Sequence, residues 1–333
     1  MKKAYIKSIS YYLSENEISN SSLSLRFPEW SPEKILKKTG INKRFKSNKN
    51  EFSSDLAIKA SEKLFKEYSI DRNKIDFVIL CTQSPDYFLP TTACILQDKL
   101  ELPNSCGALD FNLGCSGYVY GLAICKGLVE SSIAKNILFI TAETYSKFIH
   151  SNDKGNQTIF SDAASASLIS DSGICEILNF DLGTDGSGYK KLIVEEGGVK
   201  NRNFTNDFNI NEKGKIETRS YLQMNGPEIF SFTSKMVPSL IENILKKNHL
   251  QFVDINLFVF HQASKFVLDH LMKKIKIPSK KFFNNLESFG NSVSSTIPIA
   301  LKEAIDEGKC EGNVILAGFG VGLSWGGVVV KFK

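Results

Sequence analysis

The chain has 333 residues with a net charge of +5, and 42% of its residues are hydrophobic, as in an ordinary soluble globular protein. No apolar run approaches the roughly 18 residues of a membrane span, and lysines interrupt the first ten residues, so we expect neither a membrane segment nor a signal peptide. We therefore expect a cytoplasmic protein. The modest positive charge would suit an acidic partner, but it forms no dense basic stripe of the kind that binds nucleic acid.

Seven cysteines are scattered along the chain and form no Cys-x-x-Cys pair, which argues against both a disulfide framework and structural zinc. We expect no bound metal. Only four histidines are present, so acid–base chemistry has few candidates.

Strands and helices alternate through the first half of the chain. The helix over 32–39 is the most clearly bounded, because Ser31 can cap its start, Pro32 suits its first position and Gly40 can end it. The other predicted strands lie at 4–10, 75–81, 109–113 and 136–142, and the other helices begin at 54 or cover 91–100 and 118–129. Among these, the strand over 109–113 is expected to be buried.

The second half repeats the order of strand, helix, strand, turn, helix and strand. Its strands are predicted at 255–260, 281–286 and 313–318, and its helices at 228–247, 265–275 and 292–305, after a polar stretch at 197–220. Cys81 and Cys115 are 34 residues apart and His261 and Asn291 are 30 apart, so the spacings also agree. We predict an α/β protein of two equivalent halves, residues 1–175 and 176–333.

Three reactive side chains follow strands or turns at equivalent positions of the two halves. Cys115 comes after Gly114 at a strand-to-helix junction, where free helix N–H groups would favour the thiolate, although a buried structural cysteine is the alternative. His261 follows the strand over 255–260, and Asn291 lies in a Gly-Asn turn. A cysteine can hold an acyl group covalently, while a neutral histidine and an amide can donate hydrogen bonds to an enolate. The set predicts carbon–carbon bond formation at thioesters.

Four motifs occur in a fixed order along the chain. They are Asn112-Leu-Gly-Cys-Ser-Gly117, His261-Gln-Ala-Ser264, Gly290-Asn-Ser292 and Gly318-Phe-Gly-Val-Gly-Leu-Ser-Trp-Gly326. With them the chain resembles β-ketoacyl-acyl-carrier-protein synthase III, a family of the thiolase superfamily. The resemblance implies a thiolase-type, five-layered αβαβα fold and a homodimer. It also implies decarboxylative Claisen condensation of an acyl primer with malonyl-acyl-carrier protein, through an acyl-cysteine and without a resident cofactor.

The resemblance assigns site roles by position. Cys115 would be the nucleophile, and His261 and Asn291 would stabilise the enolate. The backbone N–H groups of Cys115 and Val321 would form the oxyanion hole. Leu89, in the segment 84–90, would line the acyl pocket across the dimer.

Substrates would arrive on coenzyme A or on the phosphopantetheine of an acyl carrier protein. Carrier proteins of this kind are acidic, so the lysines that follow His261 in sequence are the expected docking surface. The lysines chosen for this surface are Lys265, Lys273 and Lys274.

Three positions depart from the family pattern. Ser264 stands where the family often has asparagine, and Val321 replaces a frequent glycine, so its N–H remains a donor only if φ there is negative. Lys34 stands where many members have a tryptophan that stacks on the adenine of coenzyme A, and the nearest tryptophan is Trp30. The hypothesis is therefore a primer that arrives on a carrier protein, or on coenzyme A held through its phosphates by lysines. The alternative is that the helix after Trp30 folds this tryptophan back onto the adenine.

Two other functions remain open at this point. A thiolase-fold acyltransferase would move the acyl group to a hydroxyl or amine without condensation, although it would have no need of Asn291. The pattern Gly322-Leu-Ser-Trp-Gly326 fits a serine hydrolase, which would require a helix after the serine, whereas a strand is predicted there. Release of carbon dioxide from a malonyl donor would distinguish condensation from simple transfer.

Overall fold

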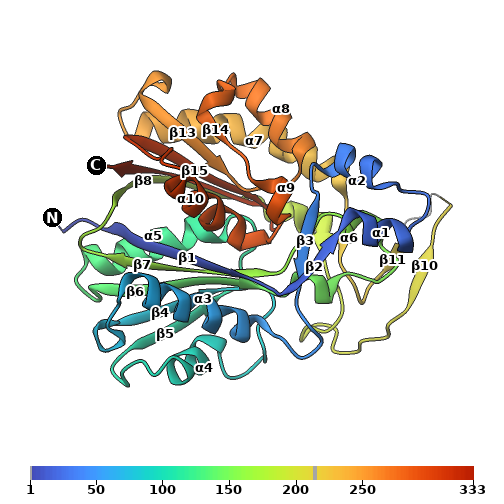
Figure 1. Cartoon of the computed structure of the whole chain (residues 1–333), viewed down its shortest axis with the longest axis horizontal. Helices are drawn as coiled ribbons and strands as arrows, with labels where there is room; N and C mark the ends of the chain where they lie inside the picture. Colours follow the sequence, from blue (N-terminus) through green and yellow to red (C-terminus); the bar gives the residue numbers. More distant parts are fainter. Residues whose placement is uncertain (1, 213–215) are drawn as a thin grey trace.

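The computed structural model describes residues 2–212 and 216–333, and it contains a sheet of ten strands arranged in two halves (Figure 1). The strands of the first half lie in the order β5-β4-β6-β7-β1. β4 pairs in parallel with β5 and β6, whereas β7 runs antiparallel to β6 and β1. Their bounds are β1 (Tyr5–Leu13), β4 (Phe77–Cys81), β5 (Gly107–Phe111), β6 (Asn136–Glu143) and β7 (Ala163–Ser170).

The second half repeats this arrangement in the order β14-β13-β15-β16-β8, with β13 parallel to β14 and β15 and with β16 antiparallel to β15 and β8. Its strands are β8 (Cys175–Thr184), β13 (Ile255–Phe260), β14 (Phe282–Phe283), β15 (Asn313–Gly320) and β16 (Ser324–Phe332). The halves meet where β1 pairs with β8. The chain enters the second half at β8, and we propose residues 1–175 and 176–333 as the two units, with the boundary at the first residue of that strand.

Helices form the remaining layers (Figure 1). α5 (Gly117–Glu130) and α10 (Thr296–Asp306) lie in the middle, and one cluster of buried hydrophobic residues joins them to strands of both halves. α3 (Ser53–Tyr68) and α4 (Thr92–Lys99) cover the outer face of the first half, and α7 (Gly226–Lys247) and α8 (Lys265–Ile275) cover that of the second. The expected five-layered αβαβα fold is therefore confirmed.

Local sequence signals place several helix ends correctly. α2 (Pro32–Thr39) begins after Ser31, whose side chain accepts a hydrogen bond from the Lys34 N–H, and it ends at Gly40, whose φ is +73°. A side chain at such a positive φ would be strained, so the glycine fits the C-cap. α8 begins after Ser264, whose hydroxyl accepts from the Val267 N–H. Ser264 thus keeps the capping function that an asparagine would also provide.

Two expectations for the strands need correction, and a third region contains strands that were not predicted. β5 is the edge strand of the sheet, and its Leu109 is 40% exposed, because only β4 pairs with it. The strand expected at 281–286 shortens to β14, which pairs with β13 through two residues. The polar stretch at 197–220 contains a small hairpin of β10 (Phe208–Ile210) and β11 (Ile216–Thr218).

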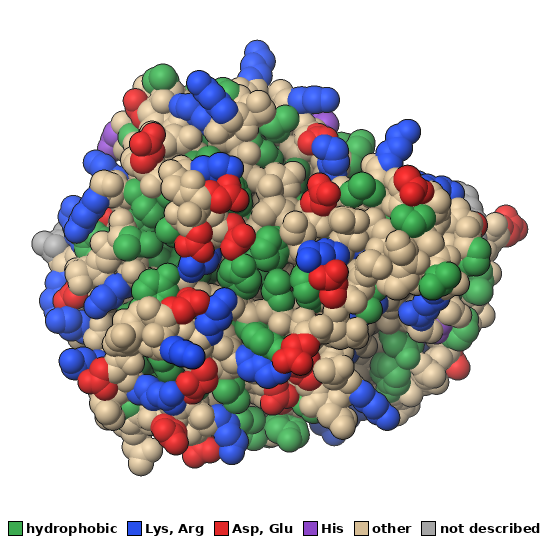
Figure 2. Space-filling view, in the orientation of Figure 1, with side chains coloured by type: hydrophobic (Ala, Val, Ile, Leu, Met, Phe, Trp, Pro, Cys, Tyr) green, Lys and Arg blue, Asp and Glu red, His purple; other side chains and the backbone are tan. Residues whose placement is uncertain are grey.

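The shorter elements lie mostly beside the sheet, on the right in Figure 1. They are β2 (Asn16–Ser19), α1 (Asn20–Arg26), β3 (Lys43–Lys46), α6 (Lys154–Gln157), β9 (Leu192–Ile193), β12 (Gln223–Met224) and α9 (Leu286–Phe289). Within residues 2–212 and 216–333, no helix is long and apolar enough to cross a membrane. On the face shown in Figure 2, basic and acidic side chains are interspersed.

Candidate functional site

Cys115 lies in the short turn between β5 and α5. The turn is closed by a hydrogen bond from the Gly117 N–H to the Gly114 carbonyl (2.8 Å). A Cβ on Gly114 would lie 2.5 Å from Gln83 Oε1 and 2.6 Å from Val321 Cγ1, so close packing at this turn requires glycine. Cys115 is 7% exposed, and its remaining surface lies on a cavity.

Two backbone N–H groups are directed at the Cys115 sulfur, those of Cys115 and Val321. Val321 is not among the described residues with a positive φ, so its backbone N–H can act as a donor as the glycine of the family would. The two groups expected to form an oxyanion hole therefore converge on the sulfur. Charge that develops beside this sulfur would be stabilised by both donors.

Burial opposes the effect expected from the helix start at Cys115. It raises the pKa of the thiol to about 12, with a further contribution from the charge of Glu143, although the two N–H groups act in the other direction. The expectation of a low-pKa thiolate is therefore wrong. The sulfur is therefore a thiol at physiological pH, because a buried anion is costly.

His261 follows β13 and is buried beneath the same cavity. Burial lowers its pKa to about 3, so the ring is neutral at physiological pH. Its Nδ1 lies 2.7 Å from Thr296 Oγ1, at the start of α10, and its ring packs edge-to-face on Phe319. Nε2 is therefore the ring nitrogen left for a ligand in the cavity.

The Thr296 hydroxyl has two possible acceptors, His261 Nδ1 and the Val293 carbonyl at 3.0 Å. When the hydroxyl donates to Nδ1, the ring carries its proton on Nε2 and can donate into the cavity. When the hydroxyl donates to Val293, Nδ1 must carry the proton instead. The direction of this hydrogen bond, together with the hydrogen bond between the ring and the Val293 backbone, sets which ring nitrogen of His261 carries the proton.

Asn291 lies on the same cavity, in the turn after α9. Its Nδ2 donates to the Ala263 carbonyl (3.2 Å), and its Oδ1 accepts from the Val293 N–H (3.0 Å). These two contacts fix the amide and leave its second N–H free to donate. Gly290 before it has φ +67°, which explains the glycine in this turn.

The three side chains meet at one cavity of about 370 Å³ between the two halves. Its wall is otherwise largely apolar, with Phe160, Leu192, Met224, Phe230 and Phe266 among its residues. Phe266 is 62% exposed and packs on Phe230, so this pair frames the mouth. An apolar cavity with a few convergent polar groups is the usual form of a small-molecule site.

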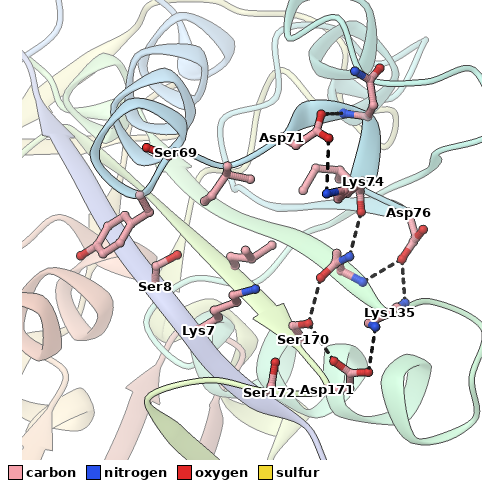
Figure 3. Close-up of a pocket in the computed structure, with 16 residues that line it drawn as sticks. Lys7, Ser8, Ser69, Asp71, Lys74, Asp76, Lys135, Ser170, Asp171 and Ser172 are labelled. Carbon is pink, nitrogen blue, oxygen red and sulfur yellow. Dashed lines mark hydrogen bonds and ion pairs between the residues drawn. The ribbon is translucent and has the colours of Figure 1, made fainter.

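A larger cavity, of about 860 Å³, lies at the opposite edge of the sheet, where β4 and β6 begin (Figure 3). Its carboxylates are engaged by neighbouring groups. Asp71 pairs with Lys74 (3.7 Å), Asp171 pairs with Lys135 (3.4 Å), and Asp76 accepts from the backbone N–H groups of Lys135 and the next residue. It contains none of the predicted site residues, so size alone does not identify the functional cavity.

The other predicted site residues lie outside the cavity. Leu89 is 87% exposed at the tip of the segment 84–90. Lys265 begins α8 beside the cavity mouth and pairs with Asp269, whereas Lys273 and Lys274 lie in the last turn of that helix. Lys274 also donates to Ser234 Oγ (2.9 Å).

Trp30 lies among three lysines. The ammonium groups of Lys34, Lys38 and Lys154 lie 5.9, 4.5 and 6.0 Å from its ring centroid, within the range of cation–π attraction. The arrangement combines an aromatic face with positive charge.

Sequence reasoning missed Glu143, a buried carboxyl at the end of β6. It accepts hydrogen bonds from the Gln83 N–H, Ser84 Oγ and Ser294 Oγ at 3.2, 3.2 and 2.9 Å, while burial raises its pKa to about 8. It thereby connects the segment that leads to Leu89 with the turn that carries Asn291. A charged residue at the end of an apolar run was the available signal.

Reactive groups at equivalent strand ends of a two-half αβαβα fold define the thiolase type of enzyme. Residues 109–186 match the family model described as 3-oxoacyl-[acyl-carrier-protein] synthase III, and residues 245–332 match the model of its C-terminal part. The chain belongs to this family, an acyltransferase family of fatty acid biosynthesis.

Relatives and solved structures match over nearly the whole chain. β-Ketoacyl-[acyl-carrier-protein] synthase III of Clostridium perfringens is 38% identical over 99% of this chain and 100% of its own. A crystal structure of 3-oxoacyl-(acyl-carrier-protein) synthase III superimposes with a TM-score of 0.96 at 43% identity, covering 99% of this chain and 100% of that chain. The synthase III structure from Thermus thermophilus gives 0.87 at 32% identity, with 98% and 99% covered.

Proposed function

We propose that the protein catalyses decarboxylative Claisen condensation of an acyl primer thioester with malonyl-acyl-carrier protein, which gives a 3-oxoacyl thioester. The observation that carries this proposal is the convergence of Cys115, His261 and Asn291 on one apolar cavity in a member of the family. The reaction needs no resident metal or redox cofactor, because the cysteine and hydrogen-bond donors supply its chemistry.

The first half-reaction loads the primer on Cys115. The sulfur attacks the thioester carbonyl, a sulfur–carbon bond forms, and the bond to the carrier sulfur breaks. The N–H groups of Cys115 and Val321 stabilise the oxyanion of the tetrahedral intermediate. The proton of the thiol leaves with the carrier sulfur, so the buried site carries no lasting charge.

The second half-reaction joins the two acyl groups. The malonyl group loses carbon dioxide, and the electron pair of the broken bond forms an enolate at the thioester carbonyl. Nε2–H of His261 and the free N–H of Asn291 donate to this oxygen. The enolate carbon then attacks the acyl-cysteine, the carbon–sulfur bond breaks, and the sulfur of Cys115 takes up a proton from solvent to return to the thiol.

Transfer of the acyl group to a hydroxyl or amine without condensation is not favoured. Such a transfer generates no enolate, so it would not require the hydrogen bond that the fixed amide of Asn291 can donate. The serine hydrolase alternative also fails, because Ser324 begins β16 and no helix follows it.

We propose a homodimer as the working assembly. The edge strand β5 exposes Leu109, and the adjacent segment 84–90 exposes Tyr87, Phe88 and Leu89 by 62, 75 and 87%. An unpaired strand edge with a contiguous group of large apolar side chains is a typical interaction surface. In such a dimer Leu89 can reach the cavity of the other subunit. Sedimentation or light scattering should give twice the mass of one chain.

A cytoplasmic location and an acyl-carrier-protein partner belong to the same proposal. All seven cysteines are free, as is usual in a reducing compartment. Lys265 at the mouth supplies positive charge for an acidic carrier, and Lys273 and Lys274 extend it along α8. The lysines around Trp30 would suit the phosphates of a coenzyme A-bound primer.

The function is tested with acetyl-coenzyme A, acetyl-carrier protein and malonyl-carrier protein. We expect an acetyl group on Cys115 by peptide mass analysis, and then one carbon dioxide for each 3-oxobutyryl product. Cys115→Ala should lose the acetyl group on the peptide and the 3-oxobutyryl product. Acetyl transfer without release of carbon dioxide would contradict condensation and favour simple acyl transfer.

A further inference from the structure

Tyr145 carries a hydroxyl into the wall of the cavity beside Cys115. The residue is 4% exposed and lines the cavity, and its phenol oxygen makes no hydrogen bond within the described part of the chain. This oxygen is not among the fully enclosed polar atoms that lack a partner. Its accessible surface therefore faces the cavity.

Tyr118, the other buried tyrosine, shows the usual solution. It is completely buried, and its oxygen lies 3.1 Å from Ser167 Oγ. Buried tyrosine hydroxyls normally find such a partner, because losing the hydrogen bond to water is costly. Tyr145 has no equivalent neighbour, so its partner must be something that enters the cavity.

The position of Tyr145 is fixed on both sides of the chain. The Thr144 N–H donates to Ser84 Oγ (3.0 Å), and the Ser146 N–H donates to Asp162 Oδ1 (2.8 Å). The ring itself packs on two aromatic neighbours, Phe148 and Phe160, with centroids 5.7 and 5.0 Å away. The hydroxyl is thus held in place before any ligand binds.

The surroundings of this hydroxyl are apolar. Tyr145 and Cys115 belong to one hydrophobic cluster, which also includes Phe160, Leu192 and Leu222. Burial raises the pKa of the Tyr145 phenol well above its ordinary value, so the group is a neutral donor. An acyl group on Cys115 would find hydrocarbon walls and one prearranged polar contact.

We propose that Tyr145 determines primer specificity by donating a hydrogen bond to an oxygen within the acyl chain. The favoured primers are hydroxyacyl or oxoacyl thioesters, in preference to hydrocarbon acyl groups of the same length. This inference rests on the proposed function, because it requires the acyl group to be loaded on Cys115. A site that supplies a buried polar partner discriminates against ligands that cannot use it.

The test compares matched primers on coenzyme A. Butyryl is paired with 3-hydroxybutyryl and propionyl with 2-hydroxypropionyl, and kcat/KM for loading is followed by the mass of the Cys115 peptide. The wild type should prefer the oxygenated member about tenfold, as expected for one hydrogen bond. Tyr145→Phe should bring the ratio close to one. Tyr118→Phe makes the same chemical change in the core and should keep the wild-type ratio.

Equal loading of both members by the wild type, or an unchanged ratio in Tyr145→Phe, would overturn the inference. Tyr145→Leu should repeat the loss of preference if the phenylalanine variant folds poorly. Failure of the proposed function would look different, because then no primer would load on Cys115 or no carbon dioxide would be released.

Discussion

The two halves of the molecule share an architecture but supply opposite chemistry at their equivalent strand ends. The first half provides the Cys115 sulfur, the proposed nucleophile, at a helix start with two backbone N–H groups directed at it. The second half provides side-chain donors, His261 and Asn291, fixed by hydrogen bonds to their own half. A duplicated framework thus brings the proposed nucleophile and the proposed anion-stabilising pair to one cavity.

Burial gives both halves the same electrostatic state by opposite shifts. It raises the pKa of Cys115 to about 12 and lowers that of His261 to about 3. Both groups are therefore neutral at physiological pH. A neutral cavity accepts an uncharged acyl group readily and meets charge only while bonds are made and broken.

The largest predicted effect is a loss of condensation without a loss of loading when a donor of the second half is removed. His261→Ala and Asn291→Ala should each lower condensation about 10²–10³-fold, because the enolate loses a donor. Loading of Cys115 should remain largely intact, since its N–H donors belong to the backbone. Single-turnover loading and release of carbon dioxide measure the two steps. If Asn291→Ala abolished loading while decarboxylation continued, the division of roles between the halves would be wrong.

The opposite pKa shifts should appear as opposite pH dependences of stability. Neutral His261 is favoured in the folded state, so its contribution is complete above pH 6.5 and is lost as pH falls toward 3. Protonated Cys115 is favoured, so its contribution is complete below pH 9 and is lost as pH rises toward 12. Each slope approaches about 1.4 kcal/mol per pH unit.

Urea unfolding of wild type, His261→Leu and Cys115→Ala across pH measures these slopes. The difference between wild type and His261→Leu should change only on the acid side, and that between wild type and Cys115→Ala only on the alkaline side. A Cys115 difference that changed near neutral pH would indicate the low-pKa thiolate that burial argues against.

The features predicted correctly from sequence depend on local signals. β13 and α8 have the expected bounds, because an apolar run, a capping serine and helical spacing lie within a few residues of one another. The reactive set Cys115, His261 and Asn291 was found from strand ends in a repeated order and meets at one cavity. Their roles remain predictions.

The features that sequence reasoning missed depend on neighbours distant in the chain. Glu143, Thr296 and Tyr145 acquire their significance only from contacts with residues of other elements. The direction of the Cys115 pKa shift depends on how completely the two halves enclose the sulfur. The exposure of β5 likewise depends on which strand pairs with it, which hydrophobicity alone does not reveal.

A smaller effect should come from Thr296, which positions His261. Thr296→Val keeps the shape but removes the hydroxyl that can donate to Nδ1. We expect condensation to fall about tenfold, the value of one hydrogen bond, with loading unchanged. Thr296→Ser should restore it. Nitrogen NMR of His261 should show protonation at Nε2 in the wild type and a mixture in the valine variant, whereas identical spectra would exclude this role.

The smallest effect should concern carrier docking, which we assign mainly to α8 of the second half. Lys265 lies at the mouth and packs against Gly40, the residue that ends α2, because a Cβ added to Gly40 would lie 2.3 Å from the Lys265 Cβ. The lysines of α2 therefore add positive charge near Lys265. Lys273 lies eight residues further along α8, about 12 Å away. Lys265→Glu should therefore raise KM for the malonyl carrier several-fold, and Lys273→Glu should raise it less, because screening reduces the attraction over this distance.

Lys331→Glu is the matched control, because it changes the charge equally on β16, where Lys331 lies opposite Asn313 at the end of β15 away from the cavity. It should leave KM unchanged, and added salt should reduce the difference between Lys265→Glu and wild type. Variants in the last turn of α8, including Lys274→Glu, should follow Lys273→Glu. Equal KM values for Lys265→Glu and Lys331→Glu would contradict carrier docking at the cavity mouth. The lysines of α8 would then be ordinary solvent-exposed residues of a helix surface.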